Sequence, residues 1–215
     1  MKEFIKLLVN FMLKIIKELS WQGWYRNKYR SQIKALHNPY TTCFSHCVCW
    51  LLQNISDQFQ YLTPDDVTVE INDYKYQQWT KDNLGQVILD KFKGNLNQLW
   101  DVQRKYIQDK LDSKSINKHA HFKTVKNNTD VLKTLIQSSP IVVSTAPKYK
   151  GKTLGHVMLI VDYEDQYRQD EWVIDDPFGD FRVGYASGHD NKGNDLKEDV
   201  NEFEKIRTGF CIYVL

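Results

Sequence analysis

The feature that most constrains this chain is the order of three chemically active residues, each at one end of a patterned segment. Cys43 directly precedes the apolar, helix-patterned run 44–52. His156 opens the apolar run 157–161, and Asp176 follows a second strand-like run further along. Thiol chemistry needs a cysteine, a histidine and a carboxylate that meet in space but not in sequence. A fold that satisfies this pattern must therefore bring a helix start and two strand ends together.

The composition limits the class of partner more than it limits the fold. The chain has 215 residues, which suits one domain of ordinary size, with or without an appendage. Its 29 basic and 27 acidic residues leave a net charge of only +2, so no overall field favours nucleic acid as a partner. The basic excess is concentrated in residues 1–39. A solvated basic face and attraction to an anionic surface are the two interpretations of this segment.

The four cysteines do not form the pattern of a disulfide framework. Cys43, Cys47 and Cys49 crowd into one short segment, and Cys211 stands alone near the C-terminal end. A chain of this length does not need covalent cross-links, so we expect reduced thiols and an intracellular, cytoplasmic setting. The segment 43–49 has no second pair of ligands at zinc spacing, and no metal is expected. The three cysteines other than Cys43 are expected to pack as buried thiols.

Residues 1–19 resemble a signal peptide only superficially. Polar side chains interrupt every apolar run, and no small-residue cleavage site follows. These polar positions recur at helical spacing and leave one wide apolar face, which indicates an amphipathic helix rather than a membrane span. We expect this helix to dock on its own domain or on a sister subunit, with peripheral binding to a membrane surface as the alternative. The sequence therefore divides into this helix, 1–19, and one domain, 20–215.

Helical signals precede strand signals along the domain. A loop is expected over 20–42, ending at Thr41 or Thr42 as the N-cap of the next helix. Helices first and antiparallel strands after is an α+β pattern. Helices are expected over 43–56, from 64 onward, over 82–112 with an interruption near Gly94, and over 131–137 behind the capping segment 128–130. Strands are expected over 141–145, 156–162, 171–175 and 209–215, and a long surface loop over 184–202.

The expected placement of Cys43 at a helix start favours its activation. Backbone N–H groups at a helix N-terminus, together with a nearby imidazolium, lower cysteine pKa values to about 3.5–7.5. His156 at the start of a buried strand could be an ordinary core residue, but the acid at the end of the next strand favours a catalytic role for it. Asp176 could orient the imidazole or merely cap a turn. Asp175 is the competing acid, and it would face the opposite side of the strand.

A tetrahedral oxyanion also needs hydrogen-bond donors. The backbone N–H of Cys43 is one, and an upstream side-chain amide would supply another. Gln32 is the best candidate for that amide and Gln22 is the second. The remaining histidines, at positions 37, 46, 119, 121 and 189, are expected to lie at the surface.

At these positions the chain resembles papain-like cysteine peptidases related to the bacteriocin-processing, double-glycine-leader type, most of all stand-alone versions met in bacteria and their phages. In that family a Gln precedes a segment like NPxxTC, GHxxxIxxY carries the His, and DP(Y/F)G carries the Asp. The matching segments here are 38–43, 155–163 and 174–180, with Gln32 upstream. The roles that the resemblance implies are oxyanion donor for Gln32, nucleophile for Cys43, base for His156 and orienting acid for Asp176.

The resemblance implies a papain-like α+β fold in which the nucleophile helix packs on an antiparallel sheet. It also implies a cysteine hydrolase that cleaves a peptide or amide bond of a peptide or protein through an acyl-enzyme, with no cofactor. The segment Phe44 to Cys47 departs from relatives that have small residues after the Cys, which affects the expected shape of the substrate pocket. No transporter segment follows, so coupled export of a leader peptide is not expected. A transpeptidase or transglutaminase-like acyltransferase, and an interaction module without turnover, remain the alternatives.

Overall fold

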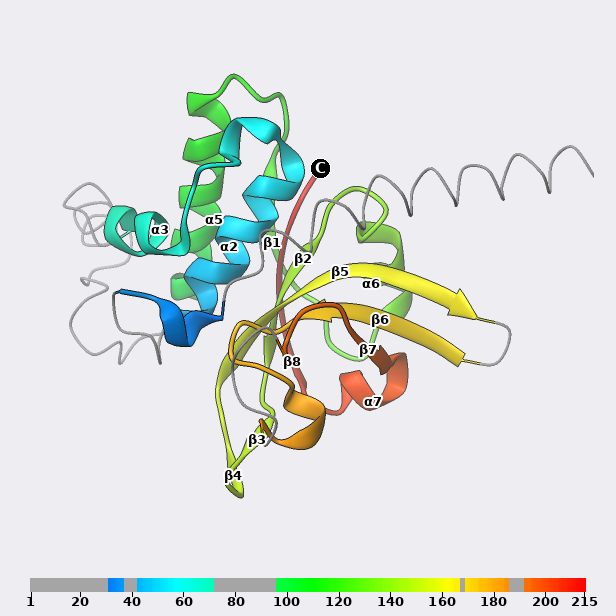
Figure 1. Ribbon diagram of the computed structural model, residues 1–215. Coiled ribbons are helices and arrows are strands. Elements are labelled where there is room, and N and C mark those ends of the chain that lie inside the picture. Colours follow the sequence, from blue (N-terminus) through cyan, green and yellow to red (C-terminus); the bar gives the residue numbers. More distant parts are fainter. Residues whose placement is uncertain (1–30, 37–41, 72–95, 167–168, 186–191) are drawn as a thin grey trace, which may run out of the picture.

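The structure consists of one large antiparallel sheet with helices on both of its faces (Figure 1). This computed structural model describes residues 31–36, 42–71, 96–166, 169–185 and 192–215. The predicted helix 1–19 and the predicted interruption near Gly94 lie outside these residues. The helices are α2 (Cys43–Ile55), α3 (Pro64–Ile71), α5 (Leu96–Ser113), α6 (Thr129–Leu135) and α7 (Val200–Glu204), with short 3-10 turns η1 (Gln32–Lys34), η2 (Asp57–Phe59) and η3 (Phe181–Val183).

The sheet has the strand order β1-β8-β2-β5-β6-β7, and each neighbouring pair is antiparallel. The strands are β1 (Ala120–Thr124), β2 (Ile141–Thr145), β5 (His156–Gln166), β6 (Gln169–Asp175), β7 (Leu196–Asp199) and β8 (Arg207–Val214), and a separate hairpin pairs β3 (Lys148–Tyr149) with β4 (Lys152–Thr153). Central strand β2 is buried at all its positions because helices cover both faces. Helices that precede an antiparallel sheet in the chain confirm the predicted α+β class.

Helix α2 lies at the centre of the helical layer. Every residue from Phe44 to Gln53 is buried, so the helix has no solvent face. Its C-terminal end is set by Ser56, whose backbone is extended. One side of α2 contacts the sheet, and other sides meet α3 and α5. A helix held on all sides gives its first residue, Cys43, a fixed position.

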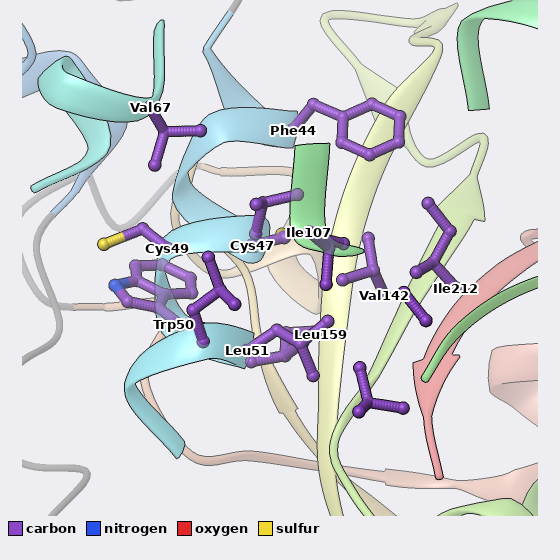
Figure 2. Close-up of a cluster of buried hydrophobic side chains, with 14 of the residues drawn as sticks. Phe44, Cys47, Cys49, Trp50, Leu51, Val67, Ile107, Val142, Leu159 and Ile212 are labelled. Carbon is purple, nitrogen blue, oxygen red and sulfur yellow. The ribbon is translucent and has the colours of Figure 1, made fainter. Parts of the chain in front are cut away.

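Strand alternation divides the apolar interior into two cores. The α2-face core lies between the sheet and helices α2, α3 and α5, and Figure 2 shows Leu51, Ile107 and Leu159 among its members. The α6-face core lies on the other side of the sheet and includes Leu132, Trp172 and members of α7. Neighbouring residues of β5 point alternately into the two, so the sheet is packed on both faces.

Most predicted elements are confirmed, including the helix that begins at Cys43 and strands β2, β5, β6 and β8. The prediction of one surface loop over 184–202 is wrong for its second part. Residues 196–199 form edge strand β7 against β6, and Asp199 then caps α7 by accepting hydrogen bonds from two backbone N–H groups. Strand β1, at the opposite edge, was not predicted. Among the described residues no helix has the length and apolar character needed to cross a membrane.

Candidate active site

Cys43 begins α2, and the start of this helix leaves its backbone donors available. The N-cap residue Thr42 makes no side-chain capping hydrogen bond. The first backbone N–H groups of a helix have no partner within the helix and carry partial positive charge. Cys43 is partly exposed, whereas Cys47, Cys49 and Cys211 are completely buried. Of the four thiols, the one at the helix start is therefore the one that a reagent or substrate can reach.

His156 and Asp176 form a buried pair next to this thiol. His156 opens β5 and its side chain is 2% exposed; the side chain of Asp176 is 0% exposed. His156 Nε2 donates a hydrogen bond to Asp176 Oδ1 over 2.7 Å. Because a carboxylate only accepts, Nε2 carries the proton, and Nδ1 is left for the hydrogen bond between His156 and the Cys43 side chain. The structure thus brings Cys43, His156 and Asp176 together in that order.

The electrostatics of the pair favour a protonated imidazole. Burial alone would lower the pKa of His156, but the charge and hydrogen bond of Asp176 outweigh it, and Cys43 adds to them. The pKa of His156 is raised to about 10 as a result. An imidazolium beside a thiol stabilises the thiolate, which is the nucleophilic form. The site therefore places a protonated imidazole beside the Cys43 thiol.

Asp176 and Asp175, the two acids that the sequence left as alternatives, have different surroundings. Asp175 Oδ1 accepts a hydrogen bond from the backbone N–H of Asp195 over 2.9 Å. Burial raises the pKa of Asp175 to about 8. Asp175 pairs with Leu159 in the β5–β6 ladder and lies on the sheet face that carries the α2-face core. Asp176 lies just past the end of β6. The acid that contacts His156 is Asp176.

Gln32 lies on a segment that is attached to the turn after Asp176. Its backbone N–H donates to the Pro177 carbonyl oxygen over 2.8 Å, and the Ser31 hydroxyl donates to the same oxygen over 3.4 Å. Gln32 is 2% exposed. These contacts bring a residue far upstream in the sequence to the acid of the candidate site. Gln22, the second candidate for an amide donor, lies outside the described residues.

The other thiols are poor candidates for chemistry. Burial raises the pKa of Cys47 well above its ordinary value, and Cys43 adds to the shift. Burial likewise raises the pKa of Cys211 to about 11. The thiol of Cys49 donates to the Leu62 carbonyl oxygen over 3.2 Å. The prediction that these three cysteines pack as buried thiols is confirmed, and all four cysteines lie in the described part of the chain without a disulfide.

The predicted surface position of His46 is wrong. His46 is completely buried in α2, and its Nδ1 donates to the Thr42 carbonyl oxygen over 2.9 Å. Its ring also meets Trp50 edge to face. The residue is buried because α2 has no solvent face. His119 is exposed as expected, His121 is half-buried against Tyr213, and positions 37 and 189 lie outside the described residues.

One residue of this site, Tyr185, has no recognisable signal in the sequence. Its hydroxyl donates to Asp176 Oδ2 over 3.1 Å. The residue lies within the predicted surface loop, and no periodicity or motif singles it out. Among the described residues, no group of three or more His, Cys, Asp or Glu side chains could hold a metal ion.

Comparison with known proteins gives one match to a family. The model of the Peptidase_C39-like family matches residues 25–194, a range that contains Gln32, Cys43, His156 and Asp176. None of the curated proteins matches the sequence significantly.

Solved structures of peptidase domains of ComA are similar to this chain at low sequence identity. A Streptococcus ComA peptidase domain, from a bifunctional ABC transporter of a quorum-sensing pathway, is 14% identical, with 78% of this chain and 89% of that chain covered and a TM-score of 0.35. The peptidase domain of Streptococcus mutans ComA is 17% identical, with a TM-score of 0.29. That match covers 47% of this chain and 66% of the other, just under two thirds of its length. A complex of the same domain with a small-molecule inhibitor is 17% identical, covers 51% and 70%, and has a TM-score of 0.27.

Proposed function

We propose that this chain, which belongs to the Peptidase_C39-like family and has an α+β papain-like fold, is a cysteine peptidase that hydrolyses an amide bond of a peptide or protein. The observation that carries the proposal is the buried hydrogen bond of 2.7 Å between His156 Nε2 and Asp176 Oδ1, beside the thiol at the start of α2. A buried acid–imidazole pair next to a reachable thiol is the arrangement that nucleophilic acyl transfer requires.

In the proposed reaction the thiolate of Cys43 attacks the carbonyl carbon and a C–S bond forms. The carbonyl oxygen becomes an oxyanion, which the Cys43 backbone N–H and the Gln32 side-chain amide stabilise. His156 then gives the proton on Nδ1 to the leaving amine, and the C–N bond breaks. Water attacks the resulting thioester while Nδ1 takes one of its protons, and the acid product leaves as the thiolate–imidazolium pair is restored.

Asp176 keeps the imidazole in the orientation that this sequence of steps needs. Because Nε2 is held by the carboxylate, Nδ1 stays directed at the sulfur and at the leaving group in turn. The uncapped start of α2 supports the same reaction, since a side chain bonded to the first-turn N–H groups would compete with the oxyanion for them.

Selective alkylation tests whether Cys43 is activated. The purified protein is treated with iodoacetamide from pH 5 to pH 8, and the modified cysteine is mapped by mass spectrometry. We expect Cys43 to react preferentially already at pH 6 and to lose this preference in His156→Ala. Cys211→Ala is the matched control, because it removes a buried thiol and should leave the labelling of Cys43 unchanged. If the labelling rate of Cys43 instead rises with pH as for an ordinary thiol, with a pKa of about 8.5, the result would argue against an enzyme and for an interaction module.

Product analysis separates hydrolysis from acyl transfer, since both use the same residues. A peptide mixture is digested in water enriched in oxygen-18, with an added primary amine in a parallel sample. A peptidase places oxygen-18 in the new C-terminal carboxylate. Products that carry the amine and no oxygen-18 would instead assign an acyltransferase.

A further inference from the structure

Asp176 is held at both of its carboxylate oxygens. Oδ1 accepts from His156 Nε2 over 2.7 Å and from the backbone N–H of Phe178 over 2.8 Å. Oδ2 accepts from the hydroxyl of Tyr185 over 3.1 Å. A carboxylate anchored at one oxygen alone can still rotate about its Cβ–Cγ bond, because that torsion is broad. The donor on the second oxygen restricts the rotation.

Tyr185 reaches Asp176 through an unusual backbone turn. Gly184 and Tyr185 follow η3 with φ values of 59° and 63°, both in the left-handed region. This region is favourable for glycine but strained for a residue with a bulky side chain. The Asp180 carbonyl oxygen accepts the Tyr185 backbone N–H over 2.9 Å and helps to hold the turn. A strained tyrosine whose hydroxyl meets a buried acid of the candidate site points to a role for that hydroxyl.

The ring of Tyr185 lies in an aromatic cluster around His156. Tyr185 is 4% exposed, and its ring meets His156 edge to face, with 6.4 Å between centroids and an interplanar angle of 88°. It also meets Phe178 and Tyr149 edge to face. Burial, and next the charge of Asp176, raise the pKa of Tyr185 above its ordinary range. The hydroxyl therefore keeps its proton and remains a donor at any pH where the site would work.

We propose that Tyr185 is a positioning residue that acts through Asp176: its hydroxyl fixes the carboxylate, which in turn directs His156 Nδ1 at Cys43. This inference rests on the proposed peptidase function and adds to it a residue outside the Cys-His-Asp-Gln set. The role is one of orientation, because the hydroxyl of Tyr185 donates its hydrogen bond to the acid.

Tyr185→Phe removes the hydroxyl and keeps the ring. A hydrogen bond to a charged group, once lost, leaves the buried carboxylate less firmly held, so Asp176 directs His156 at Cys43 less well. We expect the acid limb of the Cys43 alkylation profile to move up by about one pH unit, with a rate about tenfold lower at pH 6. Tyr149→Phe is the matched control. Tyr149 belongs to the same cluster, its hydroxyl has no hydrogen bond among the described residues, and its variant should keep the original profile.

A second background shows whether the effect passes through Asp176. In Asp176→Asn the further change Tyr185→Phe should alter the rate at pH 6 by less than about twofold, since coupled residues are not additive. If Tyr185→Phe lowers the stability, the urea midpoints of the same four proteins are compared. The stability lost on Tyr185→Phe should likewise be smaller in the Asp176→Asn background.

The outcomes separate the two proposals. An unselective wild-type Cys43 at pH 6 contradicts the peptidase proposal itself. If wild-type Cys43 is labelled selectively, two results would overturn the role of Tyr185 and leave the peptidase proposal standing. One is an unchanged alkylation profile in Tyr185→Phe, and the other is an equal effect of Tyr185→Phe with aspartate or asparagine at position 176.

Discussion

Helices α2 and α6 pack on opposite faces of the same sheet, and each buries a leucine completely, Leu51 and Leu132 respectively. Their first turns differ. The side chain of Asn128 accepts the Val131 backbone N–H at the start of α6, whereas Thr42 makes no such bond at the start of α2. Both helices pack on the sheet, but of the two only α2 lacks a side-chain cap on its first-turn donors. A helix that serves structure is capped, and the helix that carries the candidate nucleophile is not.

The same division runs through the last strand of the site. In β6, Val173 faces the α2-face core and Ile174 the α6-face core. Asp175 continues the first series, and Asp176, the next residue, is the one that contacts His156. Three matched pairs of residues therefore test which features of each face contribute to function. They are the two aspartates, the two leucines and the two N-cap residues.

The aspartate pair should give the largest effect. Asp176→Asn removes the charge that holds the imidazole, and we expect kcat to fall by about 10²- to 10⁴-fold. Asp175→Asn should stay within about threefold of the original, because its side chain accepts only a backbone N–H and an amide oxygen can do the same. The comparison is made on a cleaved peptide, with circular dichroism to confirm that both variants fold. Equal losses in the two variants would remove the distinction between the acids.

The leucine pair should be next in size. Leu51→Ala and Leu132→Ala each leave a cavity in a fully buried site, and each should lower the free energy of unfolding in urea by about 2–5 kcal/mol. Only Leu51→Ala should also slow alkylation of Cys43 in the folded protein, by several-fold, because only α2 carries the thiol. An equal slowing in Leu132→Ala would mean that the two faces position the site together.

The pH dependence of stability follows with a smaller change. The pKa of Asp175 is raised to about 8, above its unfolded value, so its contribution to stability is present below about pH 4 and is lost as the pH rises toward 8. Asp175→Asn should flatten this fall between pH 4 and 8, because the amide does not titrate in this range. Urea unfolding of both proteins at several pH values measures it. Parallel curves would show that burial does not raise the pKa of this acid.

His156 acts in a higher window, which overlaps that of Asp175 up to about pH 8 and extends beyond it. Its pKa is also raised, so the stability that it contributes is complete below its ordinary pKa near 6.5 and is lost toward about 10. The Asp175 variant should keep this alkaline loss, which makes the upper pH range an internal control.

The cap pair should give the smallest effect. Asn128→Ala removes a capping bond and should destabilise the protein by about 1 kcal/mol. Thr42→Ala removes a hydroxyl that makes no capping bond and should change the stability by less than about 0.5 kcal/mol. A larger loss for Thr42→Ala than for Asn128→Ala, measured by urea unfolding, would contradict the view that α2 begins uncapped.

The elements that the sequence predicts well are those whose own residues show a clear apolar pattern. Helix α2 and strand β2 are largely apolar segments, so their composition and their flanking residues were enough. Edge strands β1 and β7 were missed because each has a neighbour on one side only. Their outward side chains, such as Lys123 and Lys197, are polar and give the pattern of a loop.

Contacts that depend on the tertiary structure were out of reach of the sequence. Strand alternation shows that Asp175 and Asp176 face opposite ways, but not which of them meets His156. That choice depends on how β6 ends beside the start of β5. Tyr185 was missed for a related reason, since its contact with Asp176 depends on two left-handed residues after η3.

The turn after Asp176 has one further consequence, for inhibition. The Pro177 carbonyl oxygen accepts the Gln32 backbone N–H, while Asp176, one residue earlier, holds His156. One short turn thus joins the candidate oxyanion donor to the candidate base. A compound that competes with Gln32 for this carbonyl would separate the two without approaching the sulfur. Inhibitors of such a protein need not be thiol-reactive, and so could spare the many other reactive cysteines of a cell.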